Sequence, residues 1–488
     1  MVHYTQQKIN AYSPTTILFT GLAITIISSV IIGIFTEEYI FFGLPALYLG
    51  LYLAIVDFRK IFYLLLASIP ISTELELPGG FSTDFPSELL LIGLMGLYAL
   101  YFLRNGWQLG SHFFKHPITI LLLVHVGWIG LTVLHASNQV IAIKFFLAKI
   151  WYIISCYFMA GLLLKTEKDI QTFFKWVFIP LLFTVIIVMI RHALMGFSFD
   201  SINSVLNPFY RNHVSYAAIL VIFFPFLWYA PTWVTKYTKK WWLLIGSIAF
   251  FLIAIYFTYT RAAYVSLIIA AGTYFIIRFK FMKIALASAL IIVIVGLNFV
   301  AQHNKYLDFA PDFNKAIAHK KFDNLLDATA KGEDISTMER VYRWVAGGYM
   351  VKEKPWFGFG PGNFYTYYPQ YTVSSFSTYV SDNPEKSGIH CYYLMVAVEQ
   401  GILGLIIFLL LCFTVLLKAE QLYHQALTAS KRRLVLMITL SLVIILSLLL
   451  INDLIETDKV GTFFFMGMAM LVNLEKERVV GCQFDVHL

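Results

Sequence analysis

The chain is a succession of long apolar runs separated by short polar segments. A helix that crosses a bilayer needs about 20 predominantly apolar residues, within a range of roughly 17–25. The first such run, Thr15 to Phe35, is longer than the apolar part of a signal peptide, so we interpret it as a retained span. The pattern predicts an all-α, polytopic membrane protein of 12 to 14 transmembrane helices. The predicted runs are 15–35, 39–56, 60–72, 87–103, 117–135, 141–164, 170–190, 214–230, 242–259, 262–278, 281–300, 390–417, 433–451 and 459–474.

Basic residues set the predicted orientation of these spans. Short loops rich in Lys and Arg alternate with acidic or neutral loops, such as those at 36–39 and 72–80. Cytoplasmic loops carry an excess of Lys and Arg, so the basic set and both termini are predicted to lie in the cytoplasm. The basic set comprises Arg59, Lys60, Arg104, Lys115, Lys165, Lys168, Lys236, Lys239, Lys240, Arg278, Lys280, Lys283, Lys418, Lys431, Arg432 and Arg433.

This orientation predicts four parts of the chain. Residues 1–300 form the N-terminal membrane part and 390–474 the C-terminal spans. Residues 301–389 form one large loop on the outer side, and 475–488 a cytoplasmic tail. A loop of that length usually has a function.

The composition agrees with a membrane protein. Of 488 residues, 59% are hydrophobic and only 13% are charged, whereas a soluble domain has about 25% charged residues. The net charge of +8 is divided among short loops and forms no stripe that would bind nucleic acid. The four cysteines show no spacing typical of a disulfide framework or of metal ligands.

The large loop contains two recognisable segments. Residues 334–356, "DISTMERVYRWVAGGYMVKEKPW", predict an amphipathic helix that ends at Lys354 and Pro355. Its apolar face is expected to carry Val341, Trp344, Val345 and Tyr349. The following "FGFGPGNF" has phosphate-loop spacing, but no βαβ unit surrounds it, so a glycine-driven turn is the better interpretation.

Several cations lie on the predicted outer side, against the positive-inside bias. Arg211 precedes a span, Arg261 lies between two spans, and Arg340 and Arg343 lie on the amphipathic helix. Arg343 could equally lie on a solvated helix face. Because guanidinium groups are planar, bidentate donors of permanent charge, such a group of arginines suits a diphosphate. Lys144 and Lys149 also lie near the outer end of a span.

His390 and Glu399 are ionisable residues at the start of an apolar run. His390 is predicted in the first turn, where its pKa suits proton transfer near neutral pH. On a regular helix Glu399 would lie on the opposite face, about 13 Å along the axis. We therefore expect Glu399 to have a structural role, pairing with a cation or with backbone inside the bundle.

Together these residues resemble the O-antigen ligase and polymerase family of bacterial membrane glycosyltransferases. The resemblance covers about residues 210–415 and rests on four motifs in order: "TYTRAAY", "ERVYRW", "PWFGFGPGNF" and "HCYYLMVAVEQG". Two positions depart from the family pattern: Thr260 stands where serine is usual, and Cys391 where a small polar residue is commoner.

The resemblance implies transfer of a glycan from undecaprenyl diphosphate to an acceptor hydroxyl on the periplasmic side of the bacterial inner membrane. His390 would be the general base, and Arg261, Arg340 and Arg211 would bind the donor diphosphate. Glu399 and Arg343 would support the site. We expect neither a metal nor another cofactor, since the sequence has no D-x-D element.

Several alternatives remain open at this stage. The acceptor would be lipid A–core for a ligase, another lipid-linked glycan for a polymerase, or a protein for an O-oligosaccharyltransferase. A transporter of the lipid-linked glycan would instead place ionisable residues near the bilayer midplane and repeat its halves. The large loop could also serve only to dock a partner. Ligation to lipid A–core is the preferred hypothesis.

Overall fold

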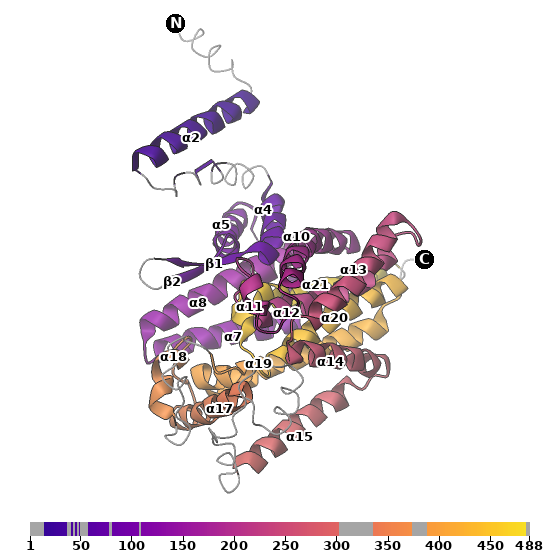
Figure 1. Ribbon diagram of the computed structural model, residues 1–488. Helices are drawn as coiled ribbons and strands as arrows, with labels where there is room; N and C mark the ends of the chain where they lie inside the picture. The colour runs from indigo at the N-terminus through magenta and orange to yellow at the C-terminus, as the bar shows by residue number, and fades with distance from the viewer. Residues whose placement is uncertain are drawn as a thin grey trace. The chain divides into compact units, whose positions relative to one another are not determined.

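The computed structural model describes residues 14–36, 41, 44–45, 48, 57–77, 81–106, 109–301, 335–372 and 388–484. The chain divides into two compact units, Met1–Leu65 and Leu66–Leu488, which we describe separately (Figure 1). In the first unit, α2 (Pro14–Thr36) is an apolar helix of the length predicted for the first span. The predicted span 39–56 lies mostly outside the described residues.

The second unit is almost entirely helical (Figure 1). Helix α4 (Phe58–Ser68) runs across the boundary between the two units. The helices that follow it are α5 (Ser87–Asn105), α6 (Ser111–Lys115), α7 (Pro117–Leu134), α8 (Gln139–Ile153), α9 (Met159–Leu163), α10 (Glu167–Leu194), α11 (Ile202–Val205), α12 (His213–Tyr229), α13 (Lys239–Tyr256), α14 (Arg261–Arg278), α15 (Met282–Ala301), α17 (Ile335–Glu353), α18 (Phe364–Tyr367), α19 (Tyr392–Gln425), α20 (Ala429–Leu448) and α21 (Asp458–Phe484).

The burial pattern is that of a membrane bundle. Among the described residues, nine helices are long and apolar enough to cross a membrane. Helix α10 exposes Ile179, Phe183, Ile186 and Ile190 along one face, which suits lipid. Helix α20, and α21 as far as Leu474, are instead buried on nearly all sides, and α20 contacts α12, α14, α19 and α21. The all-α, polytopic fold is thus confirmed, and the count of 12 to 14 spans stays a prediction.

A short β-hairpin, which the sequence analysis did not anticipate, follows α4. The predicted third span, 60–72, is only α4 and a 3₁₀ turn at Ile69–Ile71. Pro70 lies in that turn, and proline weakens a helix because it lacks the backbone N–H that would donate to the preceding turn. Strands β1 (Thr73–Leu77) and β2 (Phe81–Phe85) then pair antiparallel, with Glu74 opposite Asp84. The alternation in "TELEL" was the available signal.

Helix α17 is the predicted amphipathic helix, but a different face packs. Its buried residues include Tyr342, Ala346 and Met350, whereas Tyr349 is 42% exposed. The predicted face was therefore wrong for Tyr349, whereas Trp344 is partly buried and packs against the same core cluster as Ala346 and Met350. Small residues explain the shift, because a Cβ on Gly347 would lie 2.4 Å from the Ile389 side chain. Close packing against the segment before α19 selects the face that carries Ala346 and Gly347.

Helix α19 is broken at Gly401, whose φ of 73° and ψ of 179° are not helical. The turn before α18 satisfies the backbone groups that the break frees. Phe359 N–H donates to Val398 O and Gly360 N–H to Glu399 O, both at 2.9 Å. Ile402 N–H donates to Pro355 O at 2.8 Å. The indole Nε1 of Trp128, on α7, also donates to Gln400 O at 2.9 Å.

The glycines of "FGFGPGNF" allow this turn to lie directly against the break. Gly358, Gly360 and Gly362 all have positive φ. A Cβ on Gly358 would lie 2.5 Å from Val398 O, and one on Gly362 would lie 2.2 Å from the Phe145 ring. The segment is therefore a packed turn, as the better of the two interpretations predicted.

We expect Gly401→Ala to destabilise the protein. Its backbone lies in a region that is essentially restricted to glycine, where a side chain costs about 1–3 kcal/mol. The new Cβ would also meet Trp356 O at 2.1 Å. The measurement is the thermal unfolding midpoint in detergent.

Gly272→Ala is the matched control for this substitution. Gly272 lies within α14, and a Cβ added there would have no heavy atom within 4 Å. Alanine favours a helix over glycine by about 1 kcal/mol, so this variant should equal or exceed the wild type. An unchanged midpoint for Gly401→Ala would show that the break is not constrained as described.

Candidate active site

A cavity of about 350 Å³ brings together residues from distant parts of the second unit. Its walls come from α7, α8, the start of α12, α17, α18, the start of α19 and the segment 452–457. Four of the six predicted site residues line it: Arg211, Arg340, His390 and Glu399. Arg261 and Arg343 are not among the lining residues of this cavity.

His390 lies before α19, which begins at Tyr392, and it has a left-handed φ of 57°. The expectation of a first-turn position on a regular helix was therefore wrong. Both His390 and Glu399 line the cavity, and the predicted separation of about 13 Å between them stays a prediction. Burial, followed by the charges of Arg340 and Arg343, lowers the pKa of His390 to about 3. The imidazole is therefore neutral across the physiological pH range.

Arg343 is buried rather than solvated, with 3% of its surface exposed. Its Nη1 donates to the Gly388 carbonyl at 2.6 Å, and its guanidinium lies 5.9 Å from the centre of the Tyr368 ring. Arg343 thus holds the backbone just before His390. Arg340, one turn earlier on α17, reaches the cavity itself.

Arg211 approaches the cavity from the segment before α12. Its side chain is 66% exposed, and its Nε lies 3.7 Å from Oε2 of Glu74 on β1. Arg261 is the first residue of α14. Before it, the Thr260 hydroxyl donates to the carbonyl of His213 at 3.4 Å, which ties this helix start to α12. The contact of Thr260 thus ties the start of α14 to the start of α12, which follows Arg211. Arg261 itself does not line the cavity.

Acidic residues of the segment 452–457 form another wall of the cavity, which the sequence analysis missed. Asp453 and Glu456 both line it. Burial is the largest of the effects that raise the pKa of Asp453 to about 6. Glu456 pairs with Lys149 at 2.7 Å and accepts from the Tyr392 hydroxyl at 2.9 Å. The polar cluster "INDLIETDK" between two apolar runs was the available signal.

The pairing with Glu456 also accounts for Lys149. The sequence analysis identified this lysine as a cation near the outer end of a span, against the positive-inside bias. Only 10% of its side chain is exposed, and its charge is balanced locally. A compensated lysine of this kind contributes little net charge toward an anion in the cavity.

Glu399 lies at the break of α19 with 8% of its surface exposed. It accepts a hydrogen bond from the backbone N–H of Phe364 at 3.3 Å, so it contacts backbone, one of the two expected kinds of partner. Its neighbour Gln400 lines the cavity, and His125 on α7 lies 3.0 Å from the Gln400 amide oxygen. The break therefore presents polar side chains toward the cavity.

Contacts join loops that the sequence assigns to the same side of the membrane. Arg211, Arg340, His390 and Asp453, which line one cavity, all come from segments predicted to be periplasmic. Contacts between predicted cytoplasmic segments include those of Glu167 with Ser430, His424 with Ile277, Glu420 with Met282 and Lys418 with Glu475. The sidedness itself stays a prediction.

The chemistry of the donor atoms does not suggest a metal centre. In the part of the chain that the structure describes, no group of three or more His, Cys, Asp or Glu side chains could hold a metal ion. Metal independence nevertheless stays a prediction.

Comparison with known proteins agrees with the sequence motifs. A family model described as O-antigen ligase matches residues 246–409. A search of curated proteins found no match. The matched segment contains Arg261, Arg340, His390 and Glu399, whereas Arg211 lies before it. The match covers less than half of the chain and supports its membership of the O-antigen ligase and polymerase family.

Proposed function

We propose that the protein transfers a glycan from undecaprenyl diphosphate to an acceptor hydroxyl at the periplasmic face of the inner membrane, and that it is an O-antigen ligase acting on lipid A–core. The observation that carries the proposal is the gathering of Arg211, Arg340 and His390 in one cavity. Arginines suit a diphosphate leaving group, and a neutral imidazole suits a hydroxyl nucleophile.

In the proposed reaction, the acceptor oxygen forms a bond to the anomeric carbon as the bond from that carbon to the diphosphate oxygen breaks. The acceptor proton passes to His390. The negative charge that develops on the leaving diphosphate is stabilised by Arg211 and Arg340, which are already in place when the bond breaks.

Arg343 and Glu399 have supporting roles in this proposal. Arg343 fixes the Gly388 carbonyl and with it the unusual backbone conformation of His390. Glu399 holds the turn before α18 against the break in α19. Arg261 remains a proposed donor contact on the family resemblance alone.

A polymerase and a protein O-oligosaccharyltransferase would use the same donor chemistry with another acceptor. Surface glycans of a deletion strain, separated on a gel, distinguish ligase from polymerase. Loss of a ligase leaves no long-chain lipopolysaccharide, and lipid-linked polymer accumulates. Loss of a polymerase leaves single repeat units on the core.

A transporter of the lipid-linked glycan is the alternative from another class. Purified protein in detergent, given donor and acceptor, decides between the two. A transporter only moves the lipid-linked glycan between two compartments, and detergent provides no second compartment. A new glycosidic product would therefore show that the protein catalyses transfer. Absence of product under all conditions would overturn the proposed function.

We expect His390→Ala and His390→Asn each to lose at least the factor of about 10²–10⁴ that general-base catalysis supplies. Asparagine is the sharper substitution, because it tolerates the left-handed backbone that His390 adopts. His390→Asn should therefore keep the wild-type unfolding midpoint. Transfer at saturating donor is the measurement, and full activity of His390→Asn would remove the general-base role.

The pH dependence should differ between the free and the donor-bound protein. His390 must be neutral to accept a proton, and in the free protein its pKa is lowered to about 3. The profile of kcat/KM should therefore show no acid limb from His390 near its ordinary value of about 6.5. Bound diphosphate offsets the positive charge of Arg340 and Arg343 and should raise this pKa, so the acid limb of kcat should lie at higher pH. An acid limb of kcat/KM near pH 6.5 would contradict this interpretation.

We expect Arg340→Ala to weaken transfer by about 10²-fold or more, because it removes one of few charges that stabilise the leaving group. Arg278→Ala is the control, since Arg278 is an exposed arginine in the last turn of α14, on the predicted opposite side. Transfer rates in purified protein are compared. Normal transfer by Arg340→Ala would favour the alternative in which the large loop only docks a partner.

A further inference from the structure

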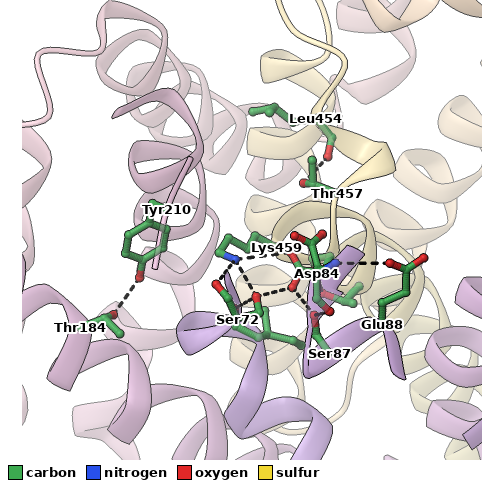
Figure 2. A network of polar contacts seen from close by, with 12 residues as sticks. Ser72, Asp84, Ser87, Glu88, Thr184, Tyr210, Leu454, Thr457 and Lys459 are labelled. Atoms are coloured by element: carbon green, nitrogen blue, oxygen red, sulfur yellow. Dashed lines mark hydrogen bonds and ion pairs between the residues drawn. The ribbon is translucent and has the colours of Figure 1, made fainter. Parts of the chain in front are cut away.

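A buried polar network joins the hairpin β1–β2 to the start of α21 (Figure 2). The Asp458 oxygen Oδ2 accepts hydrogen bonds from the hydroxyls of Ser72 at 2.5 Å and Ser87 at 2.6 Å. Lys459 donates to the Ser72 hydroxyl at 2.6 Å and to the Ser72 carbonyl at 3.0 Å. All four side chains are buried. We call Ser72, Ser87, Asp458 and Lys459 the hairpin latch.

The latch holds the hairpin at both ends. Ser72 directly precedes β1, and Ser87 follows β2 by two positions as the first residue of α5. One carboxylate oxygen therefore fixes where the hairpin begins and where it ends. Because Asp458 lies 386 positions from Ser72, the hairpin is placed by a tertiary contact with the last helix.

The charges of the latch are balanced within the protein interior. Asp458 and Lys459 are opposite charges 3.5 Å apart. Burial, and next the charge of Asp458, raises the pKa of nearby Asp84 to about 7, with Glu74 and Glu88 acting in the same direction and Lys459 opposing them. Replacing a buried ion pair by apolar residues is often neutral or stabilising, so stability alone does not account for this arrangement. Its hydrogen bonds instead fix the position of the hairpin relative to the start of α21.

The latch reaches Arg211 by two routes. The Nζ of Lys459 lies 5.7 Å from the centre of the Tyr210 ring, and the Tyr210 hydroxyl lies 2.7 Å from that of Thr184. The residue before Arg211 is thereby held in place. The hairpin itself carries Glu74, which pairs with the Arg211 guanidinium. Figure 2 shows Lys459 lying between Ser72 and Tyr210.

The latch also continues directly into the cavity wall. Glu456 and Thr457 line the cavity, and Asp458 is the next residue along the chain. A shift of Asp458 would therefore move this wall together with the hairpin.

We propose that Asp458, Lys459, Ser72 and Ser87 are positioning residues that hold Arg211 in the geometry required to bind the donor diphosphate. This inference rests on the proposed function, since it assumes that Arg211 contacts the donor. The latch residues touch neither substrate and act only through Arg211 and its neighbours.

The test measures binding of undecaprenyl diphosphate to purified protein, together with donor KM and kcat at saturating acceptor. Ser87→Ala and Asp458→Asn should raise Kd and donor KM by about threefold to tenfold, the range expected for coupled neighbouring residues. The kcat should fall as well, because Arg211 also stabilises the leaving diphosphate in the proposed reaction, whereas the pH dependence that His390 sets should not change. Ser87→Ala keeps the test valid if Asp458→Asn does not fold.

Ser155→Ala is the matched control, because it also removes a buried serine hydrogen bond, to the Leu91 carbonyl at 2.8 Å, outside the latch. It should leave Kd and KM unchanged. A double-mutant cycle with Arg211→Ala separates positioning from general destabilisation. If the latch acts through Arg211, Ser87→Ala should change Kd by less than about twofold in that background.

Two results would overturn the inference: unchanged Kd and KM in folded Ser87→Ala and Asp458→Asn, or full additivity with Arg211→Ala. Failure of the proposed function is a separate outcome. In that case the wild-type protein neither binds undecaprenyl diphosphate nor transfers a glycan. A wild type that does both, with latch variants that bind equally well, would contradict the latch alone.

Discussion

The candidate site depends on the break in α19 at Gly401. Within a bilayer, freed backbone groups must find protein partners, because no water is available to satisfy them. Here the turn before α18 supplies them, with Phe359 and Gly360 donating to Val398 and Glu399 and Pro355 accepting from Ile402. This exchange of backbone hydrogen bonds fixes part of the large loop to a membrane helix. The turn before α18 and the break in α19 are therefore held together as one structural unit.

The cavity carries both signs of charge because several segments of the chain meet there. The loop contributes Arg340, the segment before α12 contributes Arg211, and the connection between α20 and α21 contributes Asp453 and Glu456. Lys149 pairs closely with Glu456, at 2.7 Å, whereas Arg211 makes only a longer contact of 3.7 Å with Glu74. The two arginines are therefore the cations best placed to meet an anion. In a site for a diphosphate donor and a hydroxyl acceptor, this division gives the leaving group and the nucleophile different surroundings.

The sequence predicted the spans and the amphipathic helix from apolar spacing, and it selected four residues that the fold brings to one cavity. It failed where local backbone departs from regular geometry. The first-turn position predicted for His390 assumed regular helix geometry, whereas His390 precedes α19 in a left-handed conformation. The hairpin latch could not be deduced either, since Asp458 meets Ser72 across 386 positions of the chain. Only tertiary packing determines such pairs.

In the proposed reaction, the same arginines affect both the leaving group and the base. Without a donor, burial and two nearby guanidinium groups keep His390 neutral but make it a weak base. A diphosphate beside Arg340 would neutralise part of that charge and strengthen the base as it binds. Proton abstraction from the acceptor would then be favoured only when a leaving group is present. In the proposed reaction, donor binding would therefore precede activation of the acceptor.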